Sequence, residues 1–531
     1  MSIGRASAVV GAGTLVSRVT GLVRNIVLAA ALGTIGAEAA DAFAIAAQLP
    51  TNIYAIISSG LLAGVIVPQI IKAGSHRDGG SAFVSKLLTL GVVALAVTTL
   101  VAVAAAPLLV QWYGSRLGPE GVALTLAFAY WCLPQLLFYG LYALLGEILN
   151  ARRVFGPFAW SPIVNNIVSI LGFLVFIWVF GLHRDATGWT PGMVALMGGT
   201  ATLGIVAQAL VLLLFWRRAG LHVRPDFQWR GIGLRQIGRL AGWTFLMVVV
   251  GQLAGLVQTN LVGEASRAGA SVAAMQYAWL VFMLPFSVVV LSIGTPYFTR
   301  LSEHVAAGRD DAVRDDLDSS TRIIGVFMVG ALAAIVAAIV PVSRIFTDTG
   351  QDAVQFALVL GAYLVALLPL SVQFVIQRTF YAYHDTRTPF LFTLVQCTLV
   401  VITAVAAYTM LPLALLAFGI ALGQSLSNVV QLALAMGLLR RKIGRLGLRP
   451  AMVALARFVA AAIPAAAAGW LGFLLLGGVD GWATADRGTA ILSAAIVGGA
   501  TLVVYLAFLA LFRAPELQVA LGAVRRFLPG R

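Results

Sequence analysis

The sequence predicts an all-α, polytopic integral membrane protein with about 14 transmembrane helices, arranged as two six-helix lobes plus two C-terminal helices. Of its 531 residues, 60% are hydrophobic and only 10% are charged, and the mean hydropathy is +0.96. Soluble domains contain about 45–50% apolar and about 25% charged residues, because a globule needs a charged surface. The composition therefore excludes a soluble enzyme, a nucleic-acid-binding domain and a disordered protein.

The individual elements are apolar stretches long enough to cross a bilayer, which takes about 20 residues. In chain order they cover 7–32, 42–71, 83–112, 122–149, 156–181, 191–216, 236–262, 270–299, 321–345, 353–381, 388–410, 413–439, 450–477 and 488–513. This order predicts an N-terminal lobe (1–216), a cytoplasmic amphipathic linker (217–235), a C-terminal lobe (236–440), a two-helix appendage (450–513) and a cytoplasmic tail (514–531). The first stretch is expected to stay in the protein, since arginines interrupt it and it does not resemble a cleavable signal peptide.

The basic residues are distributed very unevenly between the two sides of the predicted membrane protein. With the N-terminus cytoplasmic, the termini and the loops on that side hold 28 of the 35 lysines and arginines. The loops on the other side hold five of them, namely Arg116, Arg184, Arg267, Arg344 and Arg487. Because cytoplasmic loops are enriched in basic residues, both termini are predicted to be cytoplasmic. This asymmetry accounts for the net charge of +15 without a nucleic-acid partner.

A weak internal duplication is visible in the proline pattern. Leu49-Pro50 with Pro68 in the second stretch resembles Leu284-Pro285 with Pro296 in the eighth. Parallel repeats of this kind build transporter lobes with the substrate site at their interface.

Two arginines interrupt the first apolar stretch and are the best functional candidates. Arg18 and Arg24, in SRVTGLVRN, lie about 120° apart around a helix, and Gly21 between them permits a bend. A charge at membrane depth is costly unless it faces protein or water. Two roles are open to these residues: their side chains extend to the interface, or they bind a diphosphate with planar guanidinium groups.

Few other residues are candidates for a catalytic or binding role. Asp41 opens the second stretch, either as a helix-capping carboxylate or as a possible gate residue on the outer side. No nucleotide-binding loop, no catalytic triad and no metal-spaced carboxylate pair is recognisable, so no catalytic residue, cofactor or metal is expected. The aspartate-rich segment at 300–320 is expected to be a solvated helix face. Cys132 and Cys397 are expected to be buried thiols.

Five motifs stand out along the chain: SRVTGLVRN (17–25), DAFAIAAQLP (41–50), VPQI (67–70), GEILNARRVFGPFAWSPIVNN (146–166) and FYAYHDTRTP (380–389). Together they resemble the MurJ/MviN family of lipid II flippases, in the multidrug/oligosaccharidyl-lipid/polysaccharide exporter superfamily. The resemblance implies two lobes around a cationic cavity that alternates access, and a C-terminal helix pair that forms a groove for the lipid tail. It also implies that Arg18 and Arg24 bind the substrate and that Asp41 matches the acidic residue opening the second helix.

The chain departs from the family pattern at several positions. Thr51 to Tyr54 stand where family members often carry arginine after Leu-Pro, and Asn25 stands where many carry an acid. In the eighth stretch, Trp279, Leu280 and Met283 replace a common Asp-Arg pair with a nearby Glu. The seventh stretch lacks a carboxylate, so the sodium site proposed for some relatives does not carry over.

The function expected from this resemblance is the transfer of lipid II, the undecaprenyl-diphosphate-linked peptidoglycan precursor, from the inner to the outer leaflet of the bacterial cytoplasmic membrane. Its expected partners are lipid II, membrane lipids and cell-wall synthesis proteins. Two alternatives remain: an exporter of another polyprenyl-diphosphate-linked saccharide, and a non-transporting membrane scaffold for cell-wall synthesis. A wet cavity lined by the two arginines would favour transport, and arginines that are salt-bridged or face lipid would favour the scaffold.

Overall fold

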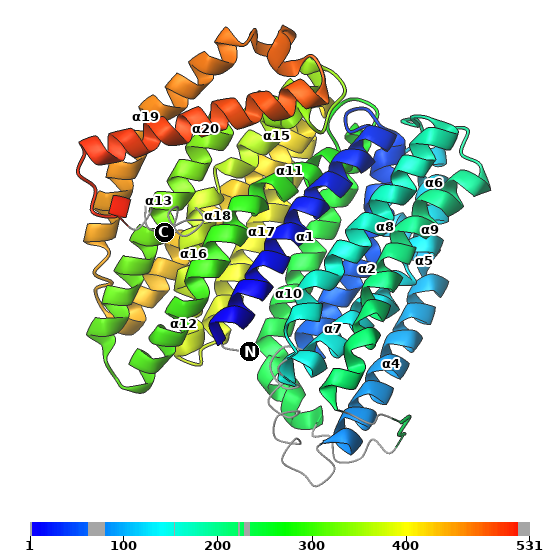
Figure 1. Cartoon of the computed structure of the whole chain (residues 1–531), viewed down its shortest axis with the longest axis horizontal. Helices are drawn as coiled ribbons and strands as arrows, with labels where there is room; N and C mark the ends of the chain where they lie inside the picture. The colour runs from blue at the N-terminus through cyan, green and yellow to red at the C-terminus, as the bar shows by residue number, and fades with distance from the viewer. Residues whose placement is uncertain (1–2, 62–79, 153, 221–223, 228–233, 519–531) are drawn as a thin grey trace. The chain divides into compact units, whose positions relative to one another are not determined.

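The computed structural model describes residues 3–61, 80–152, 154–220, 224–227 and 234–518, and this part of the chain consists mainly of helices joined by turns and loops (Figure 1). Within this part, thirteen helical segments are long and apolar enough to cross a bilayer. The predicted all-helical, multi-span fold is therefore confirmed. The predicted span at 42–71 begins within α2 (Glu38–Leu61), and its last part, with Pro68, lies outside the described residues.

The chain divides into two compact units, Met1–Arg267 and Ala268–Arg531. Besides α2, the α-helices of the first unit are α1 (Ile3–Leu32), α4 (Ser81–Ala104), α5 (Ala106–Gly114), α6 (Pro119–Cys132), α7 (Gln135–Ala151), α8 (Gly156–Phe180), α9 (Pro191–Val211) and α10 (Leu234–Val262). The helices of the second unit are α11 (Val272–Pro285), α12 (Leu291–Ala306), α13 (Asp310–Ala337), α14 (Ile339–Arg344), α15 (Gly350–Leu364), α16 (Leu367–Ala382), α17 (Arg387–Met410), α18 (Leu413–Ile443), α19 (Arg449–Leu475) and α20 (Arg487–Leu511). A single π-helical turn, Phe286–Val290, joins α11 to α12.

In the first unit, α1 packs along α8, α8 along α9, and α2 along α6. Buried aliphatic side chains join α4 to α7, among them Val84, Leu145 and Ile148. Helix α10 contacts α2 and α5, whereas the order of the apolar stretches predicts that 236–262 belongs to the C-terminal lobe. The division into six-helix lobes at 217–235 stays a prediction, and much of that linker lies outside the described residues.

The two units share a pattern of interrupted helices. In the first unit, single helical paths are broken at Ala105, between α4 and α5, and at Leu133-Pro134, between α6 and α7. The second unit repeats both breaks about 230 residues later, at Ala338 and at Val365-Ala366. A proline lies at or just after each break, as Pro107, Pro134, Pro341 and Pro369 do. Proline lacks the N–H that continues a helix, so these shared breaks support the internal duplication.

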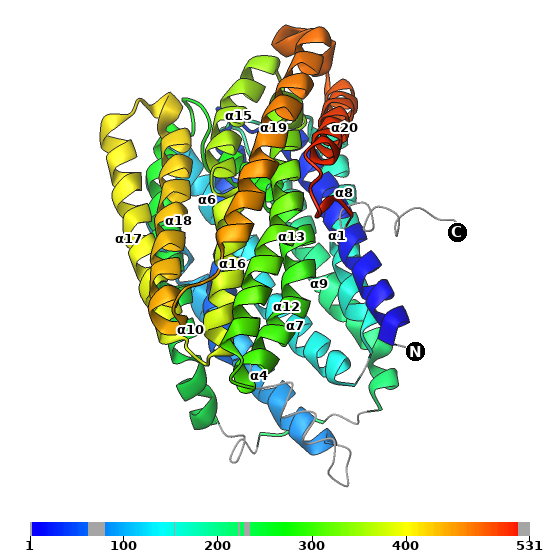
Figure 2. The ribbon, with the colours of Figure 1, turned by 90° about the vertical axis from the view of Figure 1, so that its left-hand side faces the viewer.

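The C-terminal helix pair packs on α13 in the second unit. Figure 2 shows α13 and α19 side by side, and Figure 1 shows α20 crossing obliquely near α13. The Tyr505 hydroxyl of α20 donates a hydrogen bond of 2.9 Å to the Val326 carbonyl of α13. Arg344 of α14 is buried and donates to the Thr484 and Ala485 carbonyls in the α19–α20 connection. The pair is thus held by specific polar contacts as well as by apolar packing.

The expectation that the aspartates at 300–320 form a solvated face is wrong for two of them. Asp316 is buried and pairs with Arg300 at 2.6 Å and with His304 Nδ1 at 2.9 Å. Asp318 is also buried, and it accepts the Ala451 N–H at the start of α19. These carboxylates tie α13 to its neighbours, because a buried charge is stable only when it is paired and hydrogen-bonded.

Candidate functional site

The start of α2 carries two buried carboxylates close together. Glu38 and Asp41 lie in the first helical turn, where negative charge interacts favourably with the helix dipole. Gly33 and Gly36 have φ values of 83° and 62° in the turn that leads into the helix, a backbone region that glycine adopts without steric cost. Glu38 is 4% exposed and Asp41 is 1% exposed. Carboxylates so deeply buried need strong partners.

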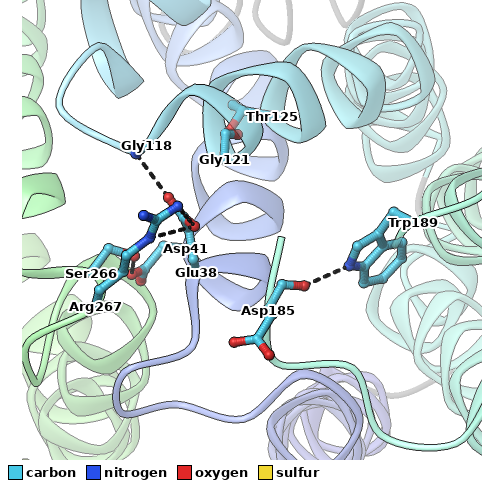
Figure 3. Close-up of polar contacts among 9 residues, drawn as sticks. All are labelled: Glu38, Asp41, Gly118, Gly121, Thr125, Asp185, Trp189, Ser266 and Arg267. Carbon is cyan, nitrogen blue, oxygen red and sulfur yellow. Dashed lines mark hydrogen bonds and ion pairs between the residues drawn. The ribbon is translucent and has the colours of Figure 1, made fainter. Parts of the chain in front are cut away.

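Glu38 receives those partners from two distant segments of the first unit (Figure 3). Its Oε1 accepts the Gly118 N–H at 2.8 Å. Its Oε2 accepts Nε and Nη2 of Arg267 at 2.9 and 2.7 Å. The hydrogen bonds and the charge of Glu38 raise the pKa of Arg267 above its usual value, so the guanidinium stays charged. One carboxylate therefore joins the α2 start, the α5–α6 turn and the segment after α10.

Asp41 lies beside this pair and accepts a hydrogen bond from the Ser266 hydroxyl. The helix begins at Glu38, so Asp41 lies inside the first turn and not at the residue that precedes it. Its carboxylate is hydrogen-bonded to a side chain that is distant in the sequence. We name Glu38, Asp41, Gly118, Ser266 and Arg267 the α2 cluster.

A second ion pair reinforces the connection between α10 and the α5–α6 turn. Arg116 Nη1 pairs with Glu264 at 2.7 Å, and its Nε donates to Asn260 Oδ1 at 3.1 Å. The Asn260 amide in turn donates to the Trp112 carbonyl and to Ser115 Oγ, both at 2.9 Å. Charge-assisted contacts of this kind are stronger than neutral ones. The end of α10 is thereby fixed to the same end of the unit as the α2 cluster.

Two glycines make room for Glu38. A Cβ added at Gly121 would lie 2.5 Å from Glu38 Oε1, and one added at Gly118 would lie 2.8 Å from the same oxygen. Real Cβ atoms do not approach so closely. An alanine at either position would therefore displace the Glu38 carboxylate, and at Gly118 it would displace the Arg267 guanidinium as well.

We expect Gly121→Ala to destabilise the first unit by about 1–3 kcal/mol, the usual cost of overpacking, because the new methyl group displaces Glu38 from Arg267. Thermal unfolding of the detergent-solubilised protein measures this. Gly251→Ala is the matched control, since a Cβ there has no heavy atom within 4 Å. A Gly121→Ala protein as stable as this control would show that the close contact is unimportant.

The two arginines predicted from the sequence both lie in α1, apart from the α2 cluster. Each is partly buried, within the apolar segment Val10–Leu32. Arg24 interacts electrostatically with Tyr139 of α7, so it is not the isolated cation that its sequence neighbourhood indicates. Arg18 has no hydrogen bond or ion pair to the residues that the structure describes. Close by, the Asn166 amide of α8 donates to the Ser17 carbonyl and Thr20 Oγ1, at 3.0 and 2.9 Å.

Sequence reasoning therefore found Asp41 but missed its neighbours. Glu38 and Arg267 are separated by 229 residues, and no local spacing links them. One signal in the sequence could have pointed to these neighbours. Few basic residues lie on the predicted outer side, and Arg116 and Arg267, which both form ion pairs here, are among them. In the described part of the chain, no group of three or more His, Cys, Asp or Glu side chains is placed to hold a metal ion.

The fold is that of a known class of membrane transporter. A solved structure of a lipid II flippase MurJ in an inward closed conformation matches with a TM-score of 0.71, at 18% identity, covering 95% of this chain and 98% of that one. An inward-facing multidrug resistance MATE family transporter of the MOP superfamily matches with a TM-score of 0.63, at 15% identity, over 81% of this chain and 95% of that one.

The sequence comparisons assign the chain to a particular family within this class. The family model "Lipid II flippase MurJ" matches residues 28–479, and the chain belongs to this family. A probable lipid II flippase MurJ of Rhizobium meliloti (strain 1021) is 27% identical over 497 residues, covering 90% of this chain and 88% of the relative. Its counterpart in Rhizobium tropici is 27% identical over 447 residues, covering 81% and 80%. The resemblance stated from the motifs is confirmed, and the family is one of transporters. Arg18 and Arg24 precede the matched segment.

Proposed function

We propose that this protein moves lipid II from the inner to the outer leaflet of the bacterial cytoplasmic membrane by alternating access. Membership of the lipid II flippase MurJ family carries the proposal. The thirteen apolar segments support a multi-pass membrane location. Arg18 and Arg24 bind the diphosphate of the lipid, since a guanidinium offers two parallel donors to phosphate oxygens.

The α2 cluster acts in this proposal as a gate element. Asp41 and Glu38 hold the start of α2 to Ser266 and Arg267. Arg267 is 62% exposed while Glu38 is 4% exposed, so water reaches the pair from the arginine side. An ion pair that is open to water on one side can break and re-form during a conformational cycle at a smaller cost than a fully buried pair.

Depletion of the protein in its source bacterium tests the substrate. Lipid II should accumulate in the inner leaflet, and plasmid-borne wild-type protein should reverse the accumulation. Accumulation of a different polyprenyl-diphosphate saccharide, with normal lipid II, would show that the chain exports that saccharide. Impaired wall synthesis without any accumulated intermediate would show a scaffold, and either result would overturn the proposal.

We further propose that both termini are cytoplasmic, on the 28-to-5 distribution of basic residues and the positive-inside rule. Cysteine labelling tests this, and the background is low because Cys132 and Cys397 are buried. An impermeant maleimide added to intact cells should label Asp480→Cys, between α19 and α20, but not Arg441→Cys at the end of α18. Both positions are exposed. The reverse labelling pattern would invert the topology.

A further inference from the structure

The second unit contains a basic cavity that the transport proposal does not use. The cavity has a volume of about 380 Å³ and lies where α13, the start of α19 and the turn after α20 meet. Its lining residues are Arg322, Arg449, Pro450, Val453, Ala454, Arg457, Pro515 and Glu516. Three arginines face one glutamate, so the lining carries excess positive charge.

One of the three arginines is already neutralised. Arg322 Nε pairs with Asp318 at 2.9 Å, and its Nη1 pairs with Glu516 at 3.4 Å. Asp318 also accepts the Ala451 N–H at 2.7 Å, which occupies the N-terminus of α19. These contacts balance the charge of Arg322. The charges of the other two lining arginines, Arg449 and Arg457, are not balanced by them.

Arg449 and Arg457 supply the uncompensated charge. Neither has a hydrogen bond or ion pair to any residue within the described part of the chain. With Val453 they occupy positions four residues apart, which form one stripe along a helix. Both arginines line the cavity. Arg449 begins the apolar segment Arg449–Leu475, and Arg457 lies about two turns inside it, where a cation is costly without an anionic partner.

Exposed apolar side chains lie close in the sequence to the residues that line the cavity. Met452 is 57% exposed and Val453 55% exposed on α19, and Leu511 is 71% exposed at the end of α20. An occupant with acyl chains can lie along these side chains while its phosphate reaches the arginines. Basic pockets between transmembrane helices are known to bind anionic head groups. The volume lies at the low end of small-ligand pockets, about 300–1,000 Å³, which suits a small head group and not a large saccharide.

Glu516 adds a requirement on the head group. Its side chain is 6% exposed, and its Oε2 accepts no hydrogen bond from the residues that the structure describes. A buried carboxylate oxygen of this kind needs a donor. A head-group hydroxyl next to the phosphate would supply one without adding a positive charge beside the arginines.

We propose that this cavity binds an anionic phospholipid with a hydroxylated head group, of the phosphatidylglycerol type, through Arg449, Arg457 and Glu516. The phosphate lies between the two arginines, and a hydroxyl of the head group donates to Glu516 Oε2. The occupant is a resident bilayer lipid and not the lipid that is transported.

Native mass spectrometry of the full-length protein, titrated with defined lipids, tests the proposal. The wild type should bind phosphatidylglycerol about tenfold or more tightly than phosphatidylethanolamine, because the ammonium group of phosphatidylethanolamine cancels the charge of its phosphate and is repelled by the two arginines. The double variant R449Q/R457Q should raise the Kd for phosphatidylglycerol by the same factor or more. The matched control R440Q/R441Q removes two exposed arginines of α18 that do not line the cavity, and it should bind like the wild type.

Comparing the affinities of the wild-type protein for different lipids keeps the test valid even if R449Q/R457Q fails to fold. Phosphatidylmethanol carries the same charge but no hydroxyl, and it should bind several-fold more weakly than phosphatidylglycerol. Equal affinity for these two lipids would remove the role of Glu516. Equal affinity for phosphatidylglycerol and phosphatidylethanolamine, or unchanged binding by R449Q/R457Q, would overturn the site. Tighter binding of a polyprenyl monophosphate would reassign it to the carrier lipid.

Discussion

Arg24→Ala is expected to abolish lipid transport and growth complementation while the protein accumulates at the wild-type level. The two hydrogen bonds of a guanidinium to a diphosphate are each worth about 1.5–3 kcal/mol, so their loss weakens substrate binding more than a hundredfold. Folding should survive, because Tyr139 keeps a hydrogen bond to Thr51. Complementation of a depletion strain, with immunoblotting for the protein, measures both effects.

Two further variants sharpen this test. Arg24→Lys should restore transport only in part, since an ammonium group offers a point charge in place of a two-pronged donor. Asn25→Ala is the neighbouring control, and it should behave as wild type because the Asn25 amide donates within its own helix, to Gly21. If Arg24→Ala cells grow and transport normally, the diphosphate is bound elsewhere.

Glu38→Ala is expected to reduce transport about tenfold or more. The substitution removes three hydrogen bonds, one to Gly118 and two to Arg267, and a bond to a charged group is worth about 1.5–3 kcal/mol. If the pair acts as a unit, Arg267→Ala should also lower transport, and the double variant should be no worse than the more impaired single one. Initial transport rates in proteoliposomes measure all three.

Asp185→Asn provides the control for the Glu38 series. Asp185 is an exposed acid whose charge acts on Arg267 through space (Figure 3), and its substitution should change transport far less than Glu38→Ala does. Strictly additive losses in the Glu38→Ala/Arg267→Ala double variant would show that the two residues act independently, which contradicts the proposed gate element.

The sequence was sufficient to predict the helices, because their signal is local. Long apolar stretches predict spans wherever they occur, and the basic asymmetry is a property of the chain alone. The breaks at Ala105 and Val365-Ala366 were not predicted, although a proline follows each of them, since proline is common in membrane helices without interrupting them. Local composition does not say which prolines interrupt a helix.

The candidate site was only partly predictable, for a different reason. Arg18, Arg24 and Asp41 stood out as charges in apolar surroundings, which is a local property. The partner of Glu38 depends on how α2 and the segment after α10 pack together. Likewise, Asp316 and Asp318 look like members of a solvated acidic run, and only the packing of α13 against α12 and α19 buries them. Tertiary pairing of charges is set by the fold and is not encoded by spacing.

The interrupted helices also bear on the evolutionary origin of the chain. Helices α13 and α14 repeat the broken pair α4 and α5, whereas α19 and α20 follow the duplicated part. The polar contacts that hold this final hairpin come from α13, α14 and the turn after α14, through Asp318, Val326, Arg344 and Asp348. Such a pattern is what the fusion of a helical hairpin onto an already duplicated ancestor would leave. On this history, the contact residues on α13 and α14 diverged from those of α4 and α5 after the duplication, when the new hairpin first required them.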